Sequence, residues 1–336
     1  MWKSERRIMK TYSIASVTVA YNGADVLRTH LESLRRQTRK LDEIIVVDNA
    51  SADHTCSLLA NEYPEVTVLQ LSENGGIAGG ANAGVTYATL VKKHDWVWTL
   101  DQDSVAAPDA LEQLLTALDR MKGAADKTAI LAPLCVNTRT HVPYPALSWR
   151  GRHFELTIPH PNAEFTFVDM VISSGSLIRR EAIEQAGLQR GDFFMDFVDF
   201  EHCLRLRRHG FSVVMVRDSV LEHAIGTSTQ FKILGRTKTW SDHAPWREYY
   251  MARNETYTMW QYSPHPFTKA FVVYRMSHHA FSILLFGKNK LECLSMMWRG
   301  FLDGRAGRLG IRFRPDKKQD GFASSQPIGD ALKQEL

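Results

Sequence analysis

The fold class of this chain is decided by the stretch Trp96-Val97-Trp98-Thr99-Leu100-Asp101-Gln102-Asp103. Its first five residues are mostly β-branched or aromatic, which predicts a buried strand that ends where the acids begin. Open α/β sheets bind ligands at the carboxyl ends of their strands. Side chains at positions i and i+2 of extended backbone point the same way, so Asp101 and Asp103 can bind one hard divalent cation. Paired acids after a strand also form ordinary turns and helix caps, so the motif alone leaves both interpretations open.

Predicted strands and helices alternate through the first part of the chain. This alternation predicts an α/β protein with a mostly parallel sheet that is covered by helices on both faces. Strands are expected at residues 13–20, 43–47, 66–71, 96–100, 129–136, 165–174 and 212–216. Helices are expected at residues 26–34, 81–91, 108–121, 180–186 and 198–209, and the chain turns helical again after residue 246.

The composition is that of an ordinary globular protein. The chain has 336 residues, of which 44% are hydrophobic and 23% charged, and its net charge is +4. This mild charge calls for no nucleic-acid partner, although it suits an anionic ligand or a membrane surface. The four cysteines are widely spaced, which argues against a zinc site or a disulfide framework. The first ten residues lack an apolar stretch, so we expect no signal peptide and a cytoplasmic location.

Two polar segments are candidates for binding a nucleotide. Asp48 follows the second predicted strand, where it can accept the N3–H of a pyrimidine base or cap the next helix. Residues 73–84 are dense in glycine and precede a predicted helix, so their backbone N–H groups can approach a diphosphate closely. These glycines match neither the dinucleotide-binding nor the P-loop pattern. Close packing of a helix on a strand is the alternative interpretation.

Acids and a histidine in the second half are candidates for catalysis. Asp196, Asp199 and Glu201 lie among aromatic residues at the start of a predicted helix. An acid in such surroundings can have a raised pKa and act as a base, although acids at a helix N-terminus are also favoured by the helix dipole. His223 follows a predicted strand and can supply the third ligand of a metal. Residues 247–254 place arginines on helical faces that can hold a diphosphate or pack on the sheet.

In this order, the motifs resemble glycosyltransferase family 2, whose members have the GT-A fold. Residues 18–23, 46–51, 74–84 and 100–104 resemble the nucleotide-sugar half of that family. Residues 173–176 and 195–205 resemble its acceptor and base region. Within the family, the chain is similar to bacterial rhamnosyltransferases that build O-antigens and other surface polysaccharides. This second likeness is carried by residues 101–104, 172–176, 195–211 and 303–310.

The resemblance implies a role for each candidate residue. Asp199 would be the catalytic base, and Glu201 and Asp196 would position the acceptor. Asp103 would bind Mg²⁺ or Mn²⁺ together with Asp101 and His223. The residues that would contact the nucleotide-sugar are Ala20, Tyr21, Asn22, Asp48, Asn74, Gly75, Gly76, Asn82, Asp101, Gln102, Arg253 and Asn254.

The implied reaction is an inverting, metal-dependent transfer of L-rhamnose from dTDP-L-rhamnose to a glycan on a polyprenyl diphosphate. The glycine pairs at 75–76 and 79–80 are similar to galactofuranosyltransferases, so a UDP-sugar donor stays open. A nucleotidyltransferase would also use paired acids, but residues 20–24 lack the early Lys or Arg of its glycine-rich loop. A non-catalytic nucleotide-binding protein would not need Asp103, Asp199 and His223 together.

The resemblance divides the chain into a GT-A domain, a helical region and a tail. The GT-A domain is expected at residues 1–230, with its nucleotide-sugar half at 13–136 and its acceptor half at 137–230. The helical region is expected at 231–317, and a mobile polar tail at 318–336. The helical region mixes apolar faces with basic flanks. Such helices lie at a membrane interface, pack on the domain or form a homodimer contact, and we expect peripheral contact with the inner membrane or a dimer.

Overall fold

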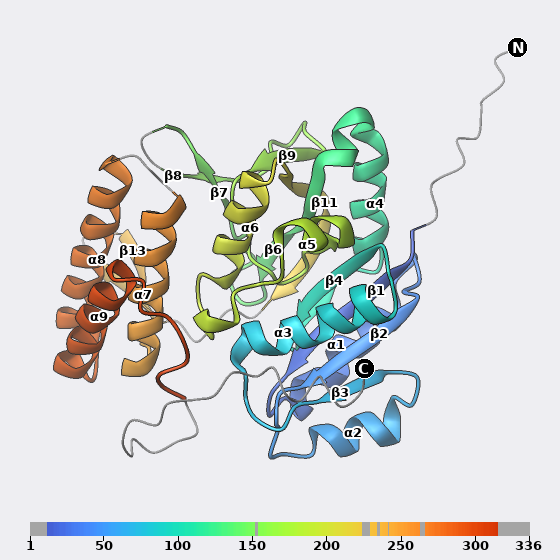
Figure 1. Ribbon diagram of the computed structural model, residues 1–336, viewed down its shortest axis with the longest axis horizontal. Helices are drawn as coiled ribbons and strands as arrows, with labels where there is room; N and C mark the ends of the chain where they lie inside the picture. Colours follow the sequence, from blue (N-terminus) through green and yellow to red (C-terminus); the bar gives the residue numbers. More distant parts are fainter. Residues whose placement is uncertain are drawn as a thin grey trace, which may run out of the picture.

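The computed structural model describes residues 12–151, 154–223, 229–233, 236–240, 242–262 and 266–314. A central β-sheet carries helices on both faces, and helices α7, α8 and α9 form a separate group beside it (Figure 1). The predicted α/β class with a helical C-terminal region is therefore confirmed. The tail predicted at 318–336 lies outside the described residues.

Five of the seven predicted strands lie within one residue of their predicted bounds. Their bounds are β1 Ile14–Ala20, β2 Glu43–Asp48, β3 Thr67–Gln70, β4 Trp96–Asp101, β5 Ser104–Ala106, β6 Thr128–Asn137, β7 Ala146–Trp149, β8 Phe154–Thr157, β9 Phe165–Val168, β10 Leu177–Arg179, β11 Ser212–His223, β12 Thr229–Ile233 and β13 Arg236–Trp240. Strands β5 and β10, the hairpins β7–β8 and β12–β13 and the helix at Thr55–Glu62 were not predicted, and β11 extends seven residues beyond its predicted end at residue 216. The helices are α1 Ala24–Arg35, α2 Thr55–Glu62, α3 Gly76–Thr86, the π-helix η1 Tyr87–Val91, α4 Ala110–Arg120, the 3₁₀-helix η2 Lys122–Lys127, α5 Arg180–Ala186, the 3₁₀-helix η3 Gly191–Phe193, α6 Val198–Arg208, α7 Pro245–Tyr262, α8 Pro266–Phe286 and α9 Lys290–Arg305.

Within the described residues, the central sheet runs in the order β3-β2-β1-β4-β10-β6-β11-β5, and β9 pairs with β11. Strands β1 to β4 are parallel, as predicted. Beyond β4 the sheet is mixed, because β10 runs antiparallel to both of its neighbours and β5 and β9 run antiparallel to β11. Strands β6 and β11 are parallel to each other and run in the same direction as β1 to β4, so the sheet is mostly parallel, as expected, and its antiparallel strands β5, β9 and β10 are confined to the half beyond β4.

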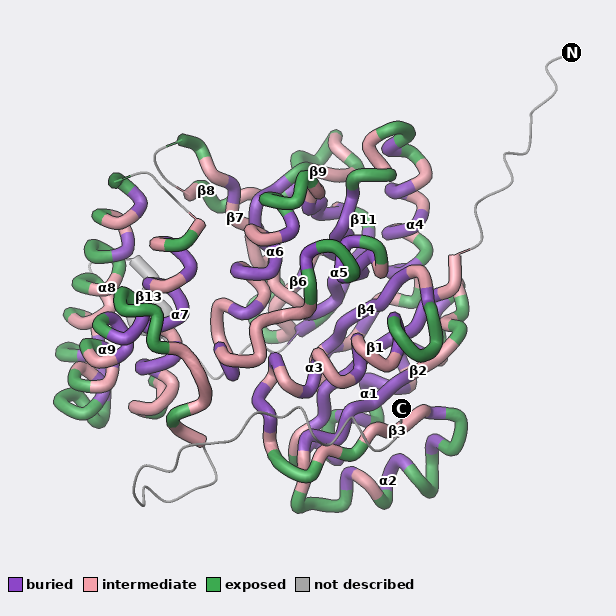
Figure 2. The backbone as a smooth tube through the Cα atoms, in the orientation of Figure 1, coloured by how far each residue is buried: buried purple, intermediate pink, exposed green. Residues whose placement is uncertain are grey.

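Both faces of the sheet are buried, which explains why the sequences of its strands are nearly continuous apolar runs. In β1, Ile14 faces the core beneath α1 and α4, whereas Ala15 and Val17 face the core beneath α3 and α6. The central strands are accordingly buried along most of their length, and the exposed residues lie on the outer sides of the helices (Figure 2). This three-layer arrangement fixes the carboxyl edge of β1, β2 and β4 as one rigid rim.

The glycine-dense segment is itself helical, which corrects the prediction of a loop before a helix at 81–91. Helix α3 begins at Gly76 and crosses β1 closely. A Cβ on Gly80 would lie 2.6 Å from Val19 Cγ1, and one on Gly84 would lie 2.4 Å from Val17 Cγ1. Close helix–strand packing is therefore the correct interpretation for Gly80 and Gly84, and only the first glycines remain at the carboxyl edge of the sheet.

We expect Gly84→Ala to destabilise the fold by about 1–3 kcal/mol, because the added methyl group overpacks a filled core. Gly79→Ala is the matched control, since nothing lies within 4 Å of a Cβ built at that position. Alanine is favoured over glycine inside a helix by up to about 1 kcal/mol, so the control should be neutral or stabilised. Urea unfolding measures both free energies. Equal stabilities would show that α3 does not need this close approach.

The strand predicted at 165–174 is too long. Strand β9 ends at Val168, and residues 169–176 form a loop that leads into β10. The loop turns back on itself, because the Ser176 N–H donates to the Ser173 carbonyl at 3.0 Å and Gly175 has a φ of +80°. A left-handed backbone at this position favours glycine and is incompatible with an extended strand.

The C-terminal helices pack by close contact of backbones. A Cβ on Gly300 of α9 would lie 2.3 Å from the Tyr249 carbonyl oxygen of α7, and one on Gly304 would lie 2.4 Å from the Arg253 carbonyl oxygen. These glycines, four residues apart, form a flat stripe on which α7 rests. None of the helices in the described segments has the length and apolarity needed to cross a bilayer.

Candidate active site

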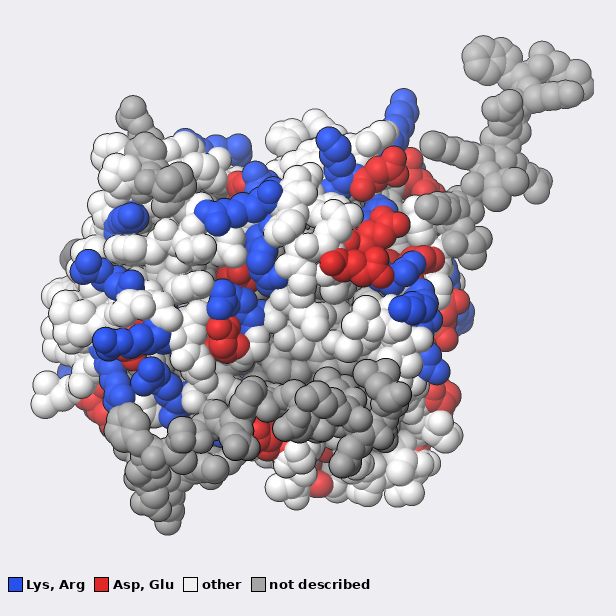
Figure 3. Space-filling view, in the orientation of Figure 1, with Lys and Arg blue, Asp and Glu red and all other residues white. Residues whose placement is uncertain are grey.

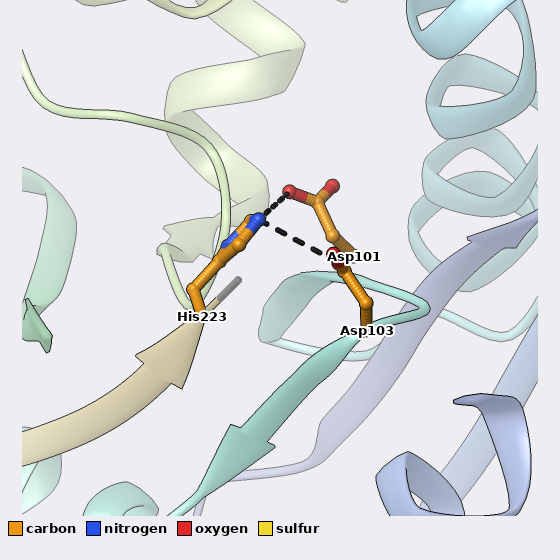
Figure 4. Close-up of side chains that lie close together, drawn as sticks. All are labelled: Asp101, Asp103 and His223. Carbon is orange, nitrogen blue, oxygen red and sulfur yellow. Dashed lines mark ion pairs between the residues drawn. The ribbon is translucent and has the colours of Figure 1, made fainter. Parts of the chain in front are cut away.

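Three side chains, two from the end of β4 and the turn after it and one from the end of β11, meet at one edge of the sheet (Figure 4). Asp101 ends β4, Asp103 lies in the two-residue turn before β5, and His223 is the last residue of β11. The Nε2 atom of His223 lies 3.6 Å from Asp101 Oδ2 and 3.5 Å from Asp103 Oδ1. Pairing of β5 with β11 places His223 opposite Ser104, which brings the histidine beside the acids. One ligand atom from each side chain lies within 4.8 Å of the other two.

The hydrogen bonds of this group fit a divalent cation. Ser174 donates to the carboxylate of Asp101, so its hydroxyl oxygen is left to accept from His223 Nδ1 at 3.0 Å. In the neutral imidazole that donates from Nδ1, Nε2 presents a lone pair to two carboxylates, and a cation between them would relieve the repulsion. Burial raises the pKa of Asp101, and the negative charge of Asp103 acts in the same direction, so a cation bound here would stabilise both carboxylates. The carboxylates suit Mg²⁺ or Mn²⁺, and the imidazole suits a transition metal such as Mn²⁺.

Asp199 lies in the first turn of α6 and has the environment of a base. Burial raises the pKa of Asp199 to about 7, although hydrogen bonds from the backbone of Phe200 and Ser173 oppose the shift. The Phe200 N–H donates to Asp199 Oδ1 at 2.9 Å. A carboxyl group that titrates near neutral pH is well matched to remove a proton at that pH.

A single loop connects the acid Asp199 to the Asp101–Asp103–His223 group. The backbone of Ser173 hydrogen-bonds to Asp199, and the hydroxyl of the next residue, Ser174, contacts His223. The Ser173 carbonyl is in turn fixed to β4, because Thr99 Oγ1 donates to it at 2.8 Å. The two groups with distinctive chemistry therefore contact neighbouring residues of one anchored loop.

The loop before Asp199 has an unusual backbone. Phe194, Asp196 and Phe197 have φ values of +67°, +54° and +61°. Each left-handed residue other than glycine costs about 1–3 kcal/mol and persists only where the surroundings enforce it. Asn254 of α7 enforces it here, since its Nδ2 atom donates to three carbonyl oxygens, those of Phe193, Met195 and Asp196.

The carboxyl edge of β1, β2 and β4, with the start of α3, carries most of the residues predicted to contact the nucleotide-sugar and is here called the donor edge. Arg253 and Asn254 do not lie at this edge, which corrects the prediction that they contact the diphosphate. Both side chains are 0% exposed. Arg253 donates to the carbonyl oxygens of Gly310, Asp192 and Phe193 at 2.6, 2.9 and 3.1 Å. With their donors directed at backbone inside the protein, both residues position the 192–196 loop.

The residues predicted to position the acceptor are also committed to protein contacts. Glu201 is 0% exposed and forms an ion pair with Arg205 at 3.0 Å, and it accepts from the hydroxyl of Tyr262. These contacts join α6 to α7, so Glu201 can position the acceptor only indirectly, through the helix that carries Asp199. Asp196 pairs with Arg247 at 3.0 Å and remains partly exposed. Asp196 is thus compatible with acceptor contact, and Glu201 is not.

Asn82 and Gln102 were predicted to contact the nucleotide-sugar, but their side chains form hydrogen bonds with the protein backbone. Asn82 donates to the Gln189 carbonyl at 2.7 Å and joins α3 to the segment before η3. The Gln102 side chain brackets the backbone of Tyr21, because its Oε1 accepts from the Tyr21 N–H at 2.8 Å and its Nε2 donates to the Tyr21 carbonyl at 3.2 Å. Both amides therefore orient neighbouring backbone, and Gln102 fixes the loop that leaves β1.

The loops that follow β1 and β2 support each other. Asn22 has a φ of +46°, and its Oδ1 accepts from the Ala52 N–H at 2.8 Å. Asp48 is 3% exposed, and its carboxylate accepts from the Ser51 N–H and the Cys56 thiol at 3.3 and 3.1 Å. Asp48 therefore fixes the turn after β2 and does not cap α2, whose N-cap residue forms no side-chain cap, and a base would have to compete with these contacts.

Asn49 joins the β2 edge to the start of α3. Its backbone N–H donates to the Ala20 carbonyl at 2.8 Å, and its Oδ1 accepts from the Gly75 N–H at 2.9 Å. Asn74 continues the network, because its Oδ1 accepts from Asn49 Nδ2 and from the Gly76 N–H at 3.2 and 2.8 Å. Ala20, Asn74, Gly75 and Gly76 are thus brought to one edge, as predicted.

Sequence reasoning missed Asn49, Ser174 and Arg314 as site residues. Asn49 and Ser174 lie inside the quoted motifs, but their neighbours carry the stronger chemical signal. Arg314 donates to the Asn74 carbonyl at 2.5 Å from the far end of the described chain. No local sequence pattern predicts such a contact, because it depends on how the C-terminal helices return the chain to the sheet.

Comparisons with known proteins agree with this architecture. Residues 16–187 match the family described as Glycosyl transferase family 2. The chain is 28% identical over 304 residues to "dTDP-rhamnosyl transferase RfbF" of Shigella flexneri, covering 89% of this chain and 97% of that protein. It is also 28% identical over 256 residues to "Galactofuranosyltransferase GlfT1" of Mycobacterium tuberculosis (strain ATCC 25618 / H37Rv), covering 75% of this chain and 83% of that protein.

A solved structure gives the same result for the fold. The crystal structure of GalNAc-T7 with UDP, GalNAc and Mn²⁺ superposes with a TM-score of 0.56 at 17% identity, covering 80% of this chain and 55% of that chain. The family match covers more than half of the 336 residues. The chain therefore belongs to glycosyl transferase family 2, is a glycosyltransferase and has the GT-A fold.

Proposed function

We propose that this glycosyltransferase transfers L-rhamnose from dTDP-L-rhamnose to a glycan hydroxyl, with inversion, in the synthesis of a bacterial surface polysaccharide. The observation that carries the reaction type is that adjacent residues of one loop contact Asp199 and the Asp101–Asp103–His223 group. The rhamnosyl donor is supported by similarity to RfbF over most of both chains.

The chemistry assigned to Asp199 is general base catalysis. Asp199 takes the proton of an acceptor hydroxyl while that oxygen attacks the anomeric carbon, and the bond from that carbon to the nucleotide diphosphate breaks. Single displacement inverts the configuration and needs no covalent enzyme intermediate. Asp101, Asp103 and His223 would hold Mg²⁺ or Mn²⁺, which supplies positive charge to the departing diphosphate.

A UDP-sugar donor is the second candidate, because the chain is also similar to GlfT1. Thermal unfolding with dTDP, UDP or GDP, each with and without Mn²⁺ or Mg²⁺, separates the two. A ligand that binds the native state raises the midpoint by mass action, and we expect the largest metal-dependent rise with dTDP. A larger rise with UDP would contradict the rhamnosyl donor and favour a galactofuranosyl or other hexosyl donor. No rise with any nucleotide would contradict the donor site.

We also infer that the acceptor is linked to a polyprenyl diphosphate and that the outer face of α8 and α9 rests on an anionic membrane. Large apolar side chains are exposed on this face, at Phe267, Tyr274, Phe281, Leu284, Leu285, Leu291, Trp298 and Leu302. Only Glu292 and Asp303 are acidic in residues 266–314, against the bases Lys269, Arg275, Lys288, Lys290, Arg299, Arg305, Arg308, Arg312 and Arg314. Lys and Arg accordingly outnumber acids over α9 in Figure 3. Apolar side chains with a basic surround bind the interface of anionic bilayers.

The double variant Phe281→Glu, Trp298→Glu should lose most of its binding to vesicles that contain phosphatidylglycerol, measured by co-sedimentation. Both side chains are 59% exposed, so the changes should leave the core intact. Leu90→Glu is the control, since Leu90 is exposed on η1. Equal binding of wild type and double variant would contradict the membrane contact. A concentration-dependent dimer that the double variant breaks would assign this face to a second copy of the chain.

A further inference from the structure

The chain returns from the helical group to the donor edge through residues 310–314, here called the C-terminal strap. Its last residue, Arg314, has a side chain that is 15% exposed. Arg314 Nη1 donates to the Asn74 carbonyl at 2.5 Å, and Nη2 lies 3.1 Å from Glu73 Oε1. A residue of the far C-terminal region therefore holds the segment that enters α3.

The strap is firmly anchored upstream of this contact. The Tyr250 hydroxyl accepts from the N–H groups of Arg312 and Phe313 at 2.8 and 2.9 Å and donates to the Phe313 carbonyl at 2.9 Å. A phenol has two acceptor positions and one proton, so all of its hydrogen-bonding capacity is used on the strap. The Phe313 ring packs edge-on against Tyr249 at 5.0 Å between centroids. These contacts restrain the strap and hold Arg314 at the donor edge.

The segment that Arg314 holds depends on contacts with other parts of the chain, among them those of the Asn49 side chain with Gly75 and Gly76. It contains Gly75 and Gly76, which have large backbone freedom, and Gly76 has a φ of +73°. Toward the loop that precedes Asp199, the Ala78 N–H donates to the Phe194 carbonyl at 3.4 Å, which is a long hydrogen bond. Ordering a loop when a ligand binds costs free energy, and ordering it in advance strengthens binding.

We propose that Arg314 is a positioning residue for the nucleotide-sugar, which holds residues 73–76 in the conformation that receives the donor. The proposal rests on the proposed function, because it assumes that residues 74–76 face a nucleotide diphosphate. The affinity for the donor then depends on a contact made by the C-terminal strap. Tyr250 holds the strap in the position from which Arg314 makes that contact.

Four variants test the proposal: Arg314→Ala, Arg314→Lys, Tyr250→Phe and the control Arg308→Ala. Arg308 is a suitable control because its exposed side chain pairs with Asp303 at 3.5 Å, away from residues 73–76. We expect Arg314→Ala to weaken dTDP binding in the presence of Mn²⁺ by about 10-fold, the loss of a charged hydrogen bond. The KM for the donor should rise by the same factor, while kcat and the KM for the acceptor stay within about twofold.

The other variants separate positioning from general damage to the fold. Arg314→Lys should recover part of the affinity, since an ammonium group can still donate to the Asn74 carbonyl. Tyr250→Phe should also weaken dTDP binding, although the guanidinium group of Arg314 is intact in this variant. Arg308→Ala should match wild type. Hydrogen exchange of the amides in residues 74–78 should be faster in Arg314→Ala without nucleotide.

The outcomes distinguish this inference from the proposed function. If wild type binds dTDP and Arg314→Ala binds it equally well with unchanged exchange, the inference is overturned and the proposed function stands. If Arg314→Ala lowers kcat and leaves the donor KM unchanged, the positioning role is also overturned. If wild type binds no nucleotide with any metal, the proposed function falls and this inference falls with it.

Discussion

Asp199→Asn is expected to lower kcat by about 10²–10⁴-fold, the usual contribution of a general base. The amide has nearly the shape of the carboxyl group but cannot accept the proton of the acceptor hydroxyl. Binding of the donor nucleotide with Mn²⁺ should be unchanged, because Asp199 lies on α6 and the donor edge is built from β1, β2 and α3. Turnover assays together with calorimetric titration of dTDP measure the two effects separately.

The pH dependence gives a second readout of the same residue. Because burial raises the pKa of Asp199 to about 7, the active carboxylate form is lost as the pH falls through that value. The kcat/KM of wild type should therefore drop about tenfold per pH unit below pH 7 and level off above it. Asp199→Asn should lack this acidic limb. Asp218→Asn, on the exposed part of β11, is the control and should keep both rate and profile. A variant at Asp199 with normal turnover would remove Asp199 from the chemistry.

Asp103→Ala is the second change with a large expected effect: metal-dependent binding of the donor nucleotide should weaken by at least about 100-fold. Two carboxylates and one imidazole form the group, so loss of one carboxylate leaves an incomplete set of ligands. Wild type treated with EDTA should lose dTDP affinity and regain it with Mn²⁺, whereas treated Asp103→Ala should not. Calorimetric titration of Mn²⁺ in the presence of dTDP reports both.

Glu222→Gln is the matched control for this group. Glu222 precedes His223 in β11, and its exposed side chain points to the other face of the strand. The control removes one negative charge near the site while Asp101, Asp103 and His223 remain. Metal-independent binding of dTDP to wild type would contradict the role given to the three side chains, as would an equal loss in Glu222→Gln.

Much of the fold was predictable because local pattern and final burial agree. Helix α5 matches its prediction at both ends, since an extended residue precedes it and Gly187, with a φ of +83°, ends it. The end of β4 was predictable because Asp101 interrupts an apolar run. The strand predicted at 165–174 failed because β9 ends where its partner β11 begins, at the Val168–Val213 pair, and a continuous apolar run does not reveal where the partner strand stops.

The candidate site was predictable where chemistry depends on residue type alone. Asp101, Asp103 and His223 have few structural uses in common, and the structure brings them together. Arg253 and Glu201 show why the rest was not predictable. A buried arginine that satisfies backbone carbonyls and an arginine that binds a diphosphate have the same sequence signature, and only tertiary packing separates them.

The loop through Ser173 and Ser174 also sets where the protein can change its length during evolution. Because adjacent residues of this loop touch Asp199 and His223, one inserted or deleted residue would shift one half of the site against the other. The β7–β8 hairpin carries no such double contact in the structure as described, and Leu156 at its surface is 68% exposed. Homologues that accept different glycans should therefore vary in length between residues 137 and 165, and keep the spacing from residue 173 to residue 199 constant.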